Sequence, residues 1–319
     1  MSSNAPGVEF RIPGFGETYS VEYIDDSWAA YLMGNIAAYL IHVTDELTKW
    51  GYSRGKDIRA APYDFRYAPH SQNQYFERLR HLVEETYTMN ANTPVTLVAH
   101  SMGGIFGQYF LHTVSQKWKD KYINGFVAVN TPWKGTVMIS NLYTSGYNWG
   151  ITPLDREILR MQQRSWETGV LLLPQEDAWG ESEILVRTPT RNYTARDYED
   201  YFRDIEHPLG NELFDNIRHS SYDMDHPGVD TYCVYSYGTD TPEQLVYDEG
   251  EFPDGDATMM MGAGDGTVNL RSLEYCKQWI YNHNGHYVAD VVTFKGIEHI
   301  DLLFHKDFLL FLKRIVMMK

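Results

Sequence analysis

Apolar residues recur along this chain with two different spacings, and each spacing predicts a different kind of element. Over Trp28–Trp50 and Gln72–Tyr87 they return every three or four positions, as on one face of an amphipathic helix. Apolar runs over Pro94–Ala99 and Gly125–Asn130 indicate buried strands, and Asp57–Ala61 is expected to form a further short strand. Strands that alternate with helices predict a mostly parallel α/β sheet.

This alternation stops after Trp133. From about Met138 to Pro227 the sequence is aromatic, charged and irregular, which we interpret as a cap inserted above the sheet. The alternation then resumes with two expected strands and an amphipathic terminal helix, at Thr231–Tyr237, Tyr287–Phe294 and Ile300–Val316. The predicted domains are an α/β core over residues 1–137 and 231–319 and a cap over residues 138–230.

One apolar run stands out within the predicted cap. Val170–Pro174 lies between Trp166 and Trp179 in the sequence. The run is suited to binding acyl chains or to contact with a lipid interface, and it is equally suited to a plain core segment.

Composition and charge narrow the classes of function. The chain has 319 residues, 43% of them hydrophobic, so it can bury a sizeable core. Its net charge of -16 and pI near 5.1 argue against nucleic acid as a partner, because phosphates require clustered Lys and Arg. The same charge would repel an anionic membrane at neutral pH, whereas carboxylates begin to take up protons at about pH 5. An acidic compartment therefore suits this charge better than the cytosol.

The first residues, Met1–Pro13, are polar, so the chain as given is expected to carry neither a signal peptide nor a membrane anchor. Two features point to the secretory pathway instead. Asn192 begins the only N-glycosylation sequon, and the only two cysteines, Cys233 and Cys276, are an even count that would allow one disulfide. The alternatives are a chance sequon and two buried free thiols.

The strongest chemical signal is the segment Ala99–Gly103, which follows a predicted strand and precedes a predicted helix over Met102–Val114. This is the pattern of a nucleophile elbow with Ala in the first Gly position, in which a tight turn exposes the hydroxyl of Ser101. The backbone N–H of Met102, at the start of the helix, would supply one oxyanion donor. The alternative is a chance turn in which Ser101 caps the helix.

A serine nucleophile needs a base and an orienting carboxylate, which in this fold follow it as Asp and then His. His299 lies just after the last predicted strand, where this fold presents its base. His305 is the second choice, and His100 is expected to point away from the nucleophile. Asp265, in a glycine-rich turn, and Asp240 remain even candidates for the acid on spacing alone. No paired His or Cys spacing matches a metal site, so we expect neither metal nor cofactor.

Seven motifs, in this order, resemble those of the lecithin:cholesterol acyltransferase family, particularly its lysosomal phospholipase A branch. The resemblance covers almost the whole chain and implies an α/β-hydrolase fold. It assigns the roles of nucleophile, acid and base to Ser101, Asp265 and His299. The motifs are Gly51–Gly55, Ala61–Arg66, Ala99–Gly103, Thr131–Gly135, Asn192–Thr194, Gly264–Leu270 and Glu298–His299.

The resemblance also implies a function. It is a phospholipase A and O-acyltransferase activity on glycerophospholipid esters, with transfer through an acyl-serine to water or to a lipophilic alcohol such as ceramide or a sterol. The expected partner is a phospholipid membrane or lipoprotein surface, bound peripherally, and the expected location is lysosomal or secreted. The family pattern pairs Cys233 with Cys276 and places a glycan on Asn192. Two alternatives are a general serine esterase or lipase and a catalytically impaired lipid-binding relative.

The chain also departs from the family pattern. A segment that in the family precedes the present start, and that contributes the first core strand and the second oxyanion donor, is expected to be missing. Loss of one such donor costs on the order of a hundred- to a thousand-fold in rate in other serine hydrolases. Lys134 replaces a family glycine, so a Lys side chain is expected to enter a tight turn near the site.

Overall fold

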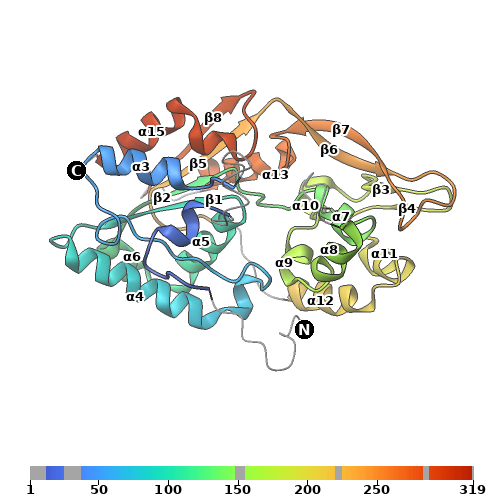
Figure 1. Cartoon of the computed structure of the whole chain (residues 1–319), viewed down its shortest axis with the longest axis horizontal. Helices are drawn as coiled ribbons and strands as arrows, with labels where there is room; N and C mark the ends of the chain where they lie inside the picture. Colours follow the sequence, from blue (N-terminus) through green and yellow to red (C-terminus); the bar gives the residue numbers. More distant parts are fainter. Residues whose placement is uncertain (1–11, 25–36, 148–154, 220–224, 283–286, 318–319) are drawn as a thin grey trace.

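In the computed structural model, which describes residues 12–24, 37–147, 155–219, 225–282 and 287–317, the strands form two four-stranded sheets. Figure 1 shows them side by side, each with helices beside it. The first sheet has the order β1-β2-β5-β8, and each neighbouring pair is parallel. Its strands are β1 (Val95–His100), β2 (Ile123–Val129), β5 (Thr231–Tyr237) and β8 (Ala289–Lys295). The four strands coincide with predicted ones.

Helices cover both faces of this parallel sheet, and its inner strand β2 is apolar on both sides. In β2, Phe126 and Ala128 face one cluster of buried side chains, whereas Val127 and Val129 face another. The first cluster packs under α4 (Asn73–Met89) and α5 (Met102–Thr113), and the second under α3 (Ile41–Lys49) and α15 (Lys306–Met317). Figure 1 shows the resulting three layers. This is the architecture of the α/β-hydrolase fold.

Most of the predicted helices are present, with two differences. The predicted helix over Trp28–Trp50 lies partly outside the described residues. Within its described part, Ile41–Lys49 form α3, whereas residues 37–40 are not helical. The predicted terminal helix is interrupted at His305, which has an extended backbone (φ −73°, ψ 127°) and separates α15 from a short 3-10 helix, η3 (Asp301–Phe304). Among the described residues of this part of the chain, four further short elements are α1 (Tyr19–Glu22), η1 (Pro69–Ser71), α6 (Gln116–Tyr122) and α14 (Gln278–Asn282).

The predicted strand over Asp57–Ala61 is wrong. This segment makes one isolated bridge, between Arg54 and Ile58. The carbonyl oxygen of Ala60 instead accepts from the N–H of Gly16 at 2.7 Å. A strand requires a neighbour that pairs along its length, and this segment pairs with a loop at a single point.

The second sheet has the order β4-β3-β6-β7 and joins the predicted cap to a hairpin from later in the chain. Strand β3 (Val186–Arg187) pairs with β4 (Asn192–Tyr193) and with β6 (Thr239–Val246), which in turn pairs with β7 (Thr258–Gly264). The helices around it are α7 (Met138–Tyr143), α8 (Arg156–Gln163), α9 (Glu167–Leu171), α10 (Glu176–Trp179), α11 (Tyr198–Asp204) and α12 (Pro208–His219).

We call the described residues of 137–217 and 239–264 the aromatic unit, because many of its buried side chains are Tyr and Phe. Leu245 and Tyr247 of the hairpin share its hydrophobic core with residues such as Val186 and Tyr201. The hairpin lies in the range that the sequence assigned to the α/β core, so its packing extends the second unit beyond residue 230. The domain boundaries themselves stay a prediction.

The apolar run Val170–Pro174 packs inside the molecule. Val170, Leu171 and Leu173 are each less than 5% exposed. Leu171 belongs to a small cluster with Ile105 of α5, so the run also contacts the helix that follows the elbow. These contacts favour the core segment over the exposed lipid interface, the two alternatives that the sequence left open.

Candidate active site

Ser101 lies in the sharp turn between β1 and α5. Its backbone, with φ 54° and ψ −132°, is unusual for a residue other than glycine and marks a strained turn. The N–H of Ser101 donates to the carbonyl oxygen of Val129 in β2 at 2.8 Å, which ties the turn to the sheet. Gly104 is required next to it, because a Cβ there would lie 1.9 Å from the hydroxyl oxygen of Thr131. The local geometry is that of a nucleophile elbow.

His299 links Ser101 to Asp265 by two hydrogen bonds. Its loop runs from β8 to η3, and its Nε2 lies 2.9 Å from Ser101 Oγ. Its Nδ1 lies 2.6 Å from Asp265 Oδ2. Because an ionised carboxylate can only accept, Nδ1 carries the proton and donates it to Asp265. Nε2 then has a free lone pair that accepts from the Ser101 hydroxyl, which is the arrangement a general base needs.

Asp265 follows β7 in the glycine-rich turn and is fully buried. Its Oδ1 accepts from the backbone N–H groups of Thr267 at 3.0 Å and Val268 at 2.7 Å. These two bonds fix the carboxylate, so Oδ2 points at the imidazole. Gly264 allows the turn to close, because a Cβ there would lie 2.3 Å from the carbonyl oxygen of Val268. The turn therefore supplies both the position and the orientation of the carboxylate.

The two competing residues lie elsewhere. Asp240 is exposed on β6, where it is paired with Ala263 of β7. The ring of His305 packs edge-on against Phe294 with centroids 6.0 Å apart. The geometry thus favours Asp265 as the acid, which spacing alone could not separate from Asp240. It also favours His299 over His305 as the base.

Met102 is the first residue of α5, directly after Ser101. The first N–H groups of a helix have no acceptor within the helix, and the helix dipole makes this end positive. Its backbone N–H is therefore placed where a developing oxyanion on a carbonyl bound at Ser101 could be stabilised.

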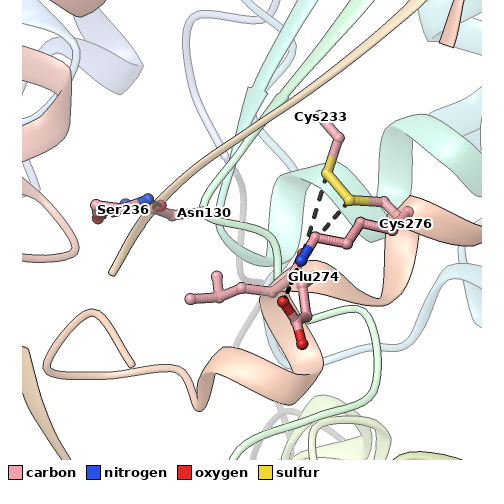
Figure 2. Close-up of a disulfide and its surroundings, with 7 residues drawn as sticks. Asn130, Cys233, Ser236, Glu274 and Cys276 are labelled. Carbon is pink, nitrogen blue, oxygen red and sulfur yellow. Dashed lines mark hydrogen bonds and ion pairs between the residues drawn. A yellow bond between two sulfur atoms is a disulfide. The ribbon is translucent and has the colours of Figure 1, made fainter. Parts of the chain in front are cut away.

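The disulfide implied by the family resemblance is confirmed. Cys233 of β5 is bonded to Cys276 of the 3-10 helix η2 (Glu274–Lys277), and both are buried. Figure 2 shows the bond joining the strand to the helical turn that contains Glu274. Helix η2 directly follows α13 (Leu270–Leu273), so the bond anchors the chain segment that leaves the Asp265 turn.

Lys134 is buried in the loop after β2, but its side chain reaches the aromatic unit. Its ammonium nitrogen lies 3.2 Å from Gln175 Oε1 and 2.7 Å from a carboxylate oxygen of Asp177. It also lies 4.5 Å from the centre of the Tyr275 ring. Lys134, which the sequence placed near the site, thus holds α10 against the loop that follows β2.

Asn192, the sequon residue, is exposed on β4 at the edge of the second sheet. The hydroxyl of Thr194 donates to Asp197 at 2.7 Å. An exposed edge position has room for a glycan, and its presence on this residue stays a prediction.

Two residues that contact His299 were not assigned a role from the sequence. His100, which was expected to point away from the nucleophile, has its ring 4.8 Å from that of His299, measured between centroids. Asn130, directly after β2, donates to the carbonyl oxygen of His299 at 2.8 Å. The only sequence signal for either residue is its place at the carboxyl end of a predicted strand.

Throughout the described ranges, every helix is too short or too polar to traverse a lipid bilayer. Nor do three or more His, Cys, Asp or Glu side chains gather there in a way that could hold a metal ion.

Comparison with known proteins places these motifs in context. The family profile described as lecithin:cholesterol acyltransferase matches residues 1–224 and 211–306. Lysosomal phospholipase A and acyltransferase from Mus musculus is 40% identical over 311 residues, which are 98% of this chain and 73% of that protein. Phosphatidylcholine-sterol acyltransferase from Gallus gallus is 40% identical over 303 residues, covering 95% of this chain and 71% of that protein. The crystal structure of the Tle4–Tli4 complex superposes with a TM-score of 0.55 at 14% identity, over 80% of this chain and 67% of that one, and supports the fold alone.

Proposed function

Because the chain belongs to the lecithin:cholesterol acyltransferase family, we propose that it is a serine lipid acyl hydrolase and O-acyltransferase acting on glycerophospholipid esters. The observation that carries the proposal is the hydrogen-bonded chain Ser101–His299–Asp265, whose members follow the carboxyl ends of β1, β8 and β7. Relatives named as a phospholipase A and acyltransferase and as a phosphatidylcholine-sterol acyltransferase support the substrate class.

The mechanism follows from the direction of each hydrogen bond. His299 Nε2 takes the hydroxyl proton as Ser101 Oγ attacks the ester carbonyl carbon, and the carbonyl oxygen becomes an oxyanion. The N–H of Met102 donates to this oxyanion. Asp265 keeps the proton on Nδ1 and stabilises the imidazolium, which next protonates the departing lysophospholipid oxygen. The products of this half are an acyl-serine and a lysophospholipid.

The second half regenerates the enzyme by the same groups. His299 takes a proton from water or from the hydroxyl of a lipophilic alcohol, whose oxygen attacks the acyl-serine carbonyl. Collapse of the second oxyanion returns the proton to Ser101 Oγ. Water gives a fatty acid, whereas an alcohol such as ceramide or a sterol gives a new ester. The ratio of hydrolysis to acyl transfer depends on how well water is excluded from the site.

The aromatic unit is proposed to act as the cap that excludes water. Its run over Val170–Leu173 contacts Ile105 on α5, so the unit is held directly beside the elbow. In this arrangement the acyl chain would lie between the unit and the carboxyl ends of the sheet. The enzyme would bind peripherally to a phospholipid membrane or lipoprotein surface.

A lysosomal or secreted location is proposed on three grounds. The Cys233–Cys276 disulfide persists in oxidising compartments and is rare in the cytosol. The net charge of -16 would repel anionic lipid at neutral pH and falls in magnitude as carboxylates take up protons. The mouse relative named above carries a lysosomal name as well.

The test is hydrolysis of phosphatidylcholine liposomes that contain short-chain ceramide or cholesterol, at about pH 5 and pH 7.5. Fatty acid, lysophospholipid and acylated acceptor are measured for the chain, for Ser101→Ala and for Ser182→Ala, which changes an exposed serine. We expect activity in the chain and in Ser182→Ala, and loss in Ser101→Ala.

Other outcomes identify the alternatives. Hydrolysis of short-chain soluble esters without phospholipid turnover would indicate a general serine esterase. Lipid binding without turnover, together with no labelling of Ser101 by a fluorophosphonate, would indicate an impaired lipid-binding relative. A fluorophosphonate reports activation of the serine independently of the lipid, because it reacts only with an activated hydroxyl.

A further inference from the structure

The backbone carbonyl of His299 is held by two buried side chains. Its oxygen lies 3.0 Å from His100 Nε2 and 2.8 Å from Asn130 Nδ2. His100 ends β1 and Asn130 follows β2, so the two donors come from adjacent strands of the sheet. Both residues are less than 7% exposed. The loop that carries the candidate base is thus attached to the parallel sheet at His299 itself.

The orientation of His100 is fixed by its second nitrogen. Since Nε2 faces a carbonyl oxygen, it carries the proton and donates it, and Nδ1 is left as an acceptor. The hydroxyl of Tyr39 lies 2.7 Å from Nδ1 and donates to it. Burial, together with the neighbouring His299, holds the pKa of His100 well below its usual range, so the ring stays neutral. A neutral His100 adds no positive charge beside the imidazolium that forms on His299.

The orientation of Asn130 is fixed in the same way. Its Oδ1 accepts from the backbone N–H of Ser236 in β5 at 2.7 Å, so its amide nitrogen is the atom that faces His299. Asn130 Nδ2 also lies 3.1 Å from Ser236 Oγ, and Figure 2 shows the two side chains together beside β5. The backbone of Asn130 has φ 47°, a conformation that asparagine tolerates better than most residues.

We propose that His100 and Asn130 form a clamp that positions the general base, with Tyr39 selecting the tautomer of His100. The proposal rests on the proposed function of the triad. His299 must satisfy Ser101 and Asp265 at the same time, and a small displacement of its backbone would lengthen one of the two bonds. Fixing the carbonyl oxygen from two strands removes that freedom. The two residues are positioning residues, because neither touches the reacting atoms.

The decisive comparison is His100→Met with His100→Gln. Met fills the space without a donor, whereas the Gln amide can still donate to the His299 carbonyl. Misplacing a catalytic group by about 1 Å can cost about 100-fold in rate. We therefore expect His100→Met to lower kcat by about 10- to 100-fold with KM nearly unchanged, and His100→Gln to recover most of that loss. Asn130→Gly, which suits the positive φ, should lower kcat in the same way.

Two further readouts distinguish a positioning role from a purely structural effect of the substitutions. The downfield proton resonance of the Asp265–His299 hydrogen bond should broaden or shift in His100→Met and return in His100→Gln. Tyr39→Phe is nearly isosteric and is the variant to use if His100→Met fails to fold. It should lower kcat by about 2- to 10-fold, the range expected for loss of one hydrogen bond. Thermal unfolding of each variant shows whether it is folded.

The clamp also predicts how the changes combine. Because both donors hold one oxygen, the double variant His100→Met/Asn130→Gly should lose little more than the stronger single variant. Effects that multiply would mean that the residues act separately and would overturn the shared clamp. Unchanged kcat in folded Tyr39→Phe and His100→Met would overturn the positioning role. If instead Ser101→Ala retains full activity, the proposed function fails first, and the two failures are thereby distinguished.

Discussion

The ammonium nitrogen of Lys134 lies 2.7 Å from a carboxylate oxygen of Asp177, which joins the loop after β2 to helix α10. The two partners differ in environment, since the Lys134 side chain is 8% exposed and that of Asp177 is 48% exposed. The hydroxyl of Tyr275 also donates to Asp177 at 2.9 Å. Burial and this carboxylate raise the pKa of Tyr275 to about 12, so the hydroxyl remains protonated and keeps donating.

This difference predicts unequal costs for the two substitutions. Asp177→Ala leaves a buried ammonium without its anion and should lower the free energy of unfolding by about 1–3 kcal/mol. Lys134→Met leaves a half-exposed carboxylate that water can solvate, so it should cost less than about 1 kcal/mol. Denaturant unfolding of both variants measures the difference. Equal costs would show that Asp177 does not compensate the buried charge.

The orientation of Asp265 predicts the result of replacing it with its amide. Backbone N–H groups hold Oδ1, so in Asp265→Asn the NH2 group would occupy the position of Oδ2 and donate to His299 Nδ1. The imidazole would then carry its proton on Nε2 and could not accept from Ser101. We expect kcat/KM for ester hydrolysis to fall by about 10⁴-fold, as in other serine hydrolases. Asp240→Asn, at the exposed competing position, should leave the rate unchanged.

The disulfide predicts a large effect on stability. Cys233 and Cys276 are separated by 43 residues, and closing a loop of this length stabilises a chain by about 4 kcal/mol in the chain-entropy description. The double variant Cys233→Ala/Cys276→Ala should lose about 2–4 kcal/mol in denaturant unfolding. Adding a reductant should destabilise the unchanged chain and leave the double variant unaffected. A variant as stable as the unchanged chain would contradict the prediction.

The sequon predicts a glycan on Asn192. Expressed through the secretory pathway of a eukaryotic host, the chain should show a mass increase that endoglycosidase removes. Asn192→Gln and Thr194→Ala should each abolish that increase, because both residues are required for acceptor recognition. Identical masses for the chain and these variants would show that the site is not used.

His207 predicts a loss of stability in acid. Burial is the main cause that lowers its pKa from 6.5 to about 4, and its ring packs against those of Tyr143 and Phe202. Because its folded pKa is below its unfolded pKa, the unfolded chain binds more protons between these values, and stability falls as pH drops from about 6.5 to 4. The contribution of this residue is on the order of 1–3 kcal/mol.

The measurement is thermal or denaturant unfolding at several pH values for the chain and for His207→Gln, which does not titrate in this range. The variant should lose less stability between about pH 6.5 and pH 4 than the unchanged chain. His81→Gln, at an exposed position, should follow the unchanged chain. Parallel curves for all three would show that His207 is not responsible.

Much of the α/β core was predicted from the local pattern of residues in the sequence. The strands β1, β2, β5 and β8 lie in runs rich in β-branched and aromatic residues, and such runs can be recognised without knowing their neighbours. The elbow at Ser101 was equally clear, since the strand, the small residues and the helix are adjacent in sequence. Motif resemblance then pointed to Asp265, His299 and the two cysteines.

Other features depended on contacts between distant segments. The strand expected over Asp57–Ala61 failed because no neighbour pairs along it, and the hairpin of β6 and β7 joined the aromatic unit because β3 supplies a partner. By composition, the run over Val170–Leu173 could be a lipid interface or a core segment. Its packing against α5 favours the core segment.

The clamp on His299 was determined by tertiary structure alone. His100 and Asn130 are separated from His299 by 199 and 169 residues, and neither belongs to a spacing that indicates a role. Which side chain donates to a carbonyl depends on where three strands end in space. The sequence by itself determined the strands of the parallel sheet, the elbow and the order of the candidate triad, because these depend on residues that are adjacent in the chain. Only the folded chain decided which buried side chains hold the base, because a hydrogen bond depends on distance and angle in space and not on position along the chain.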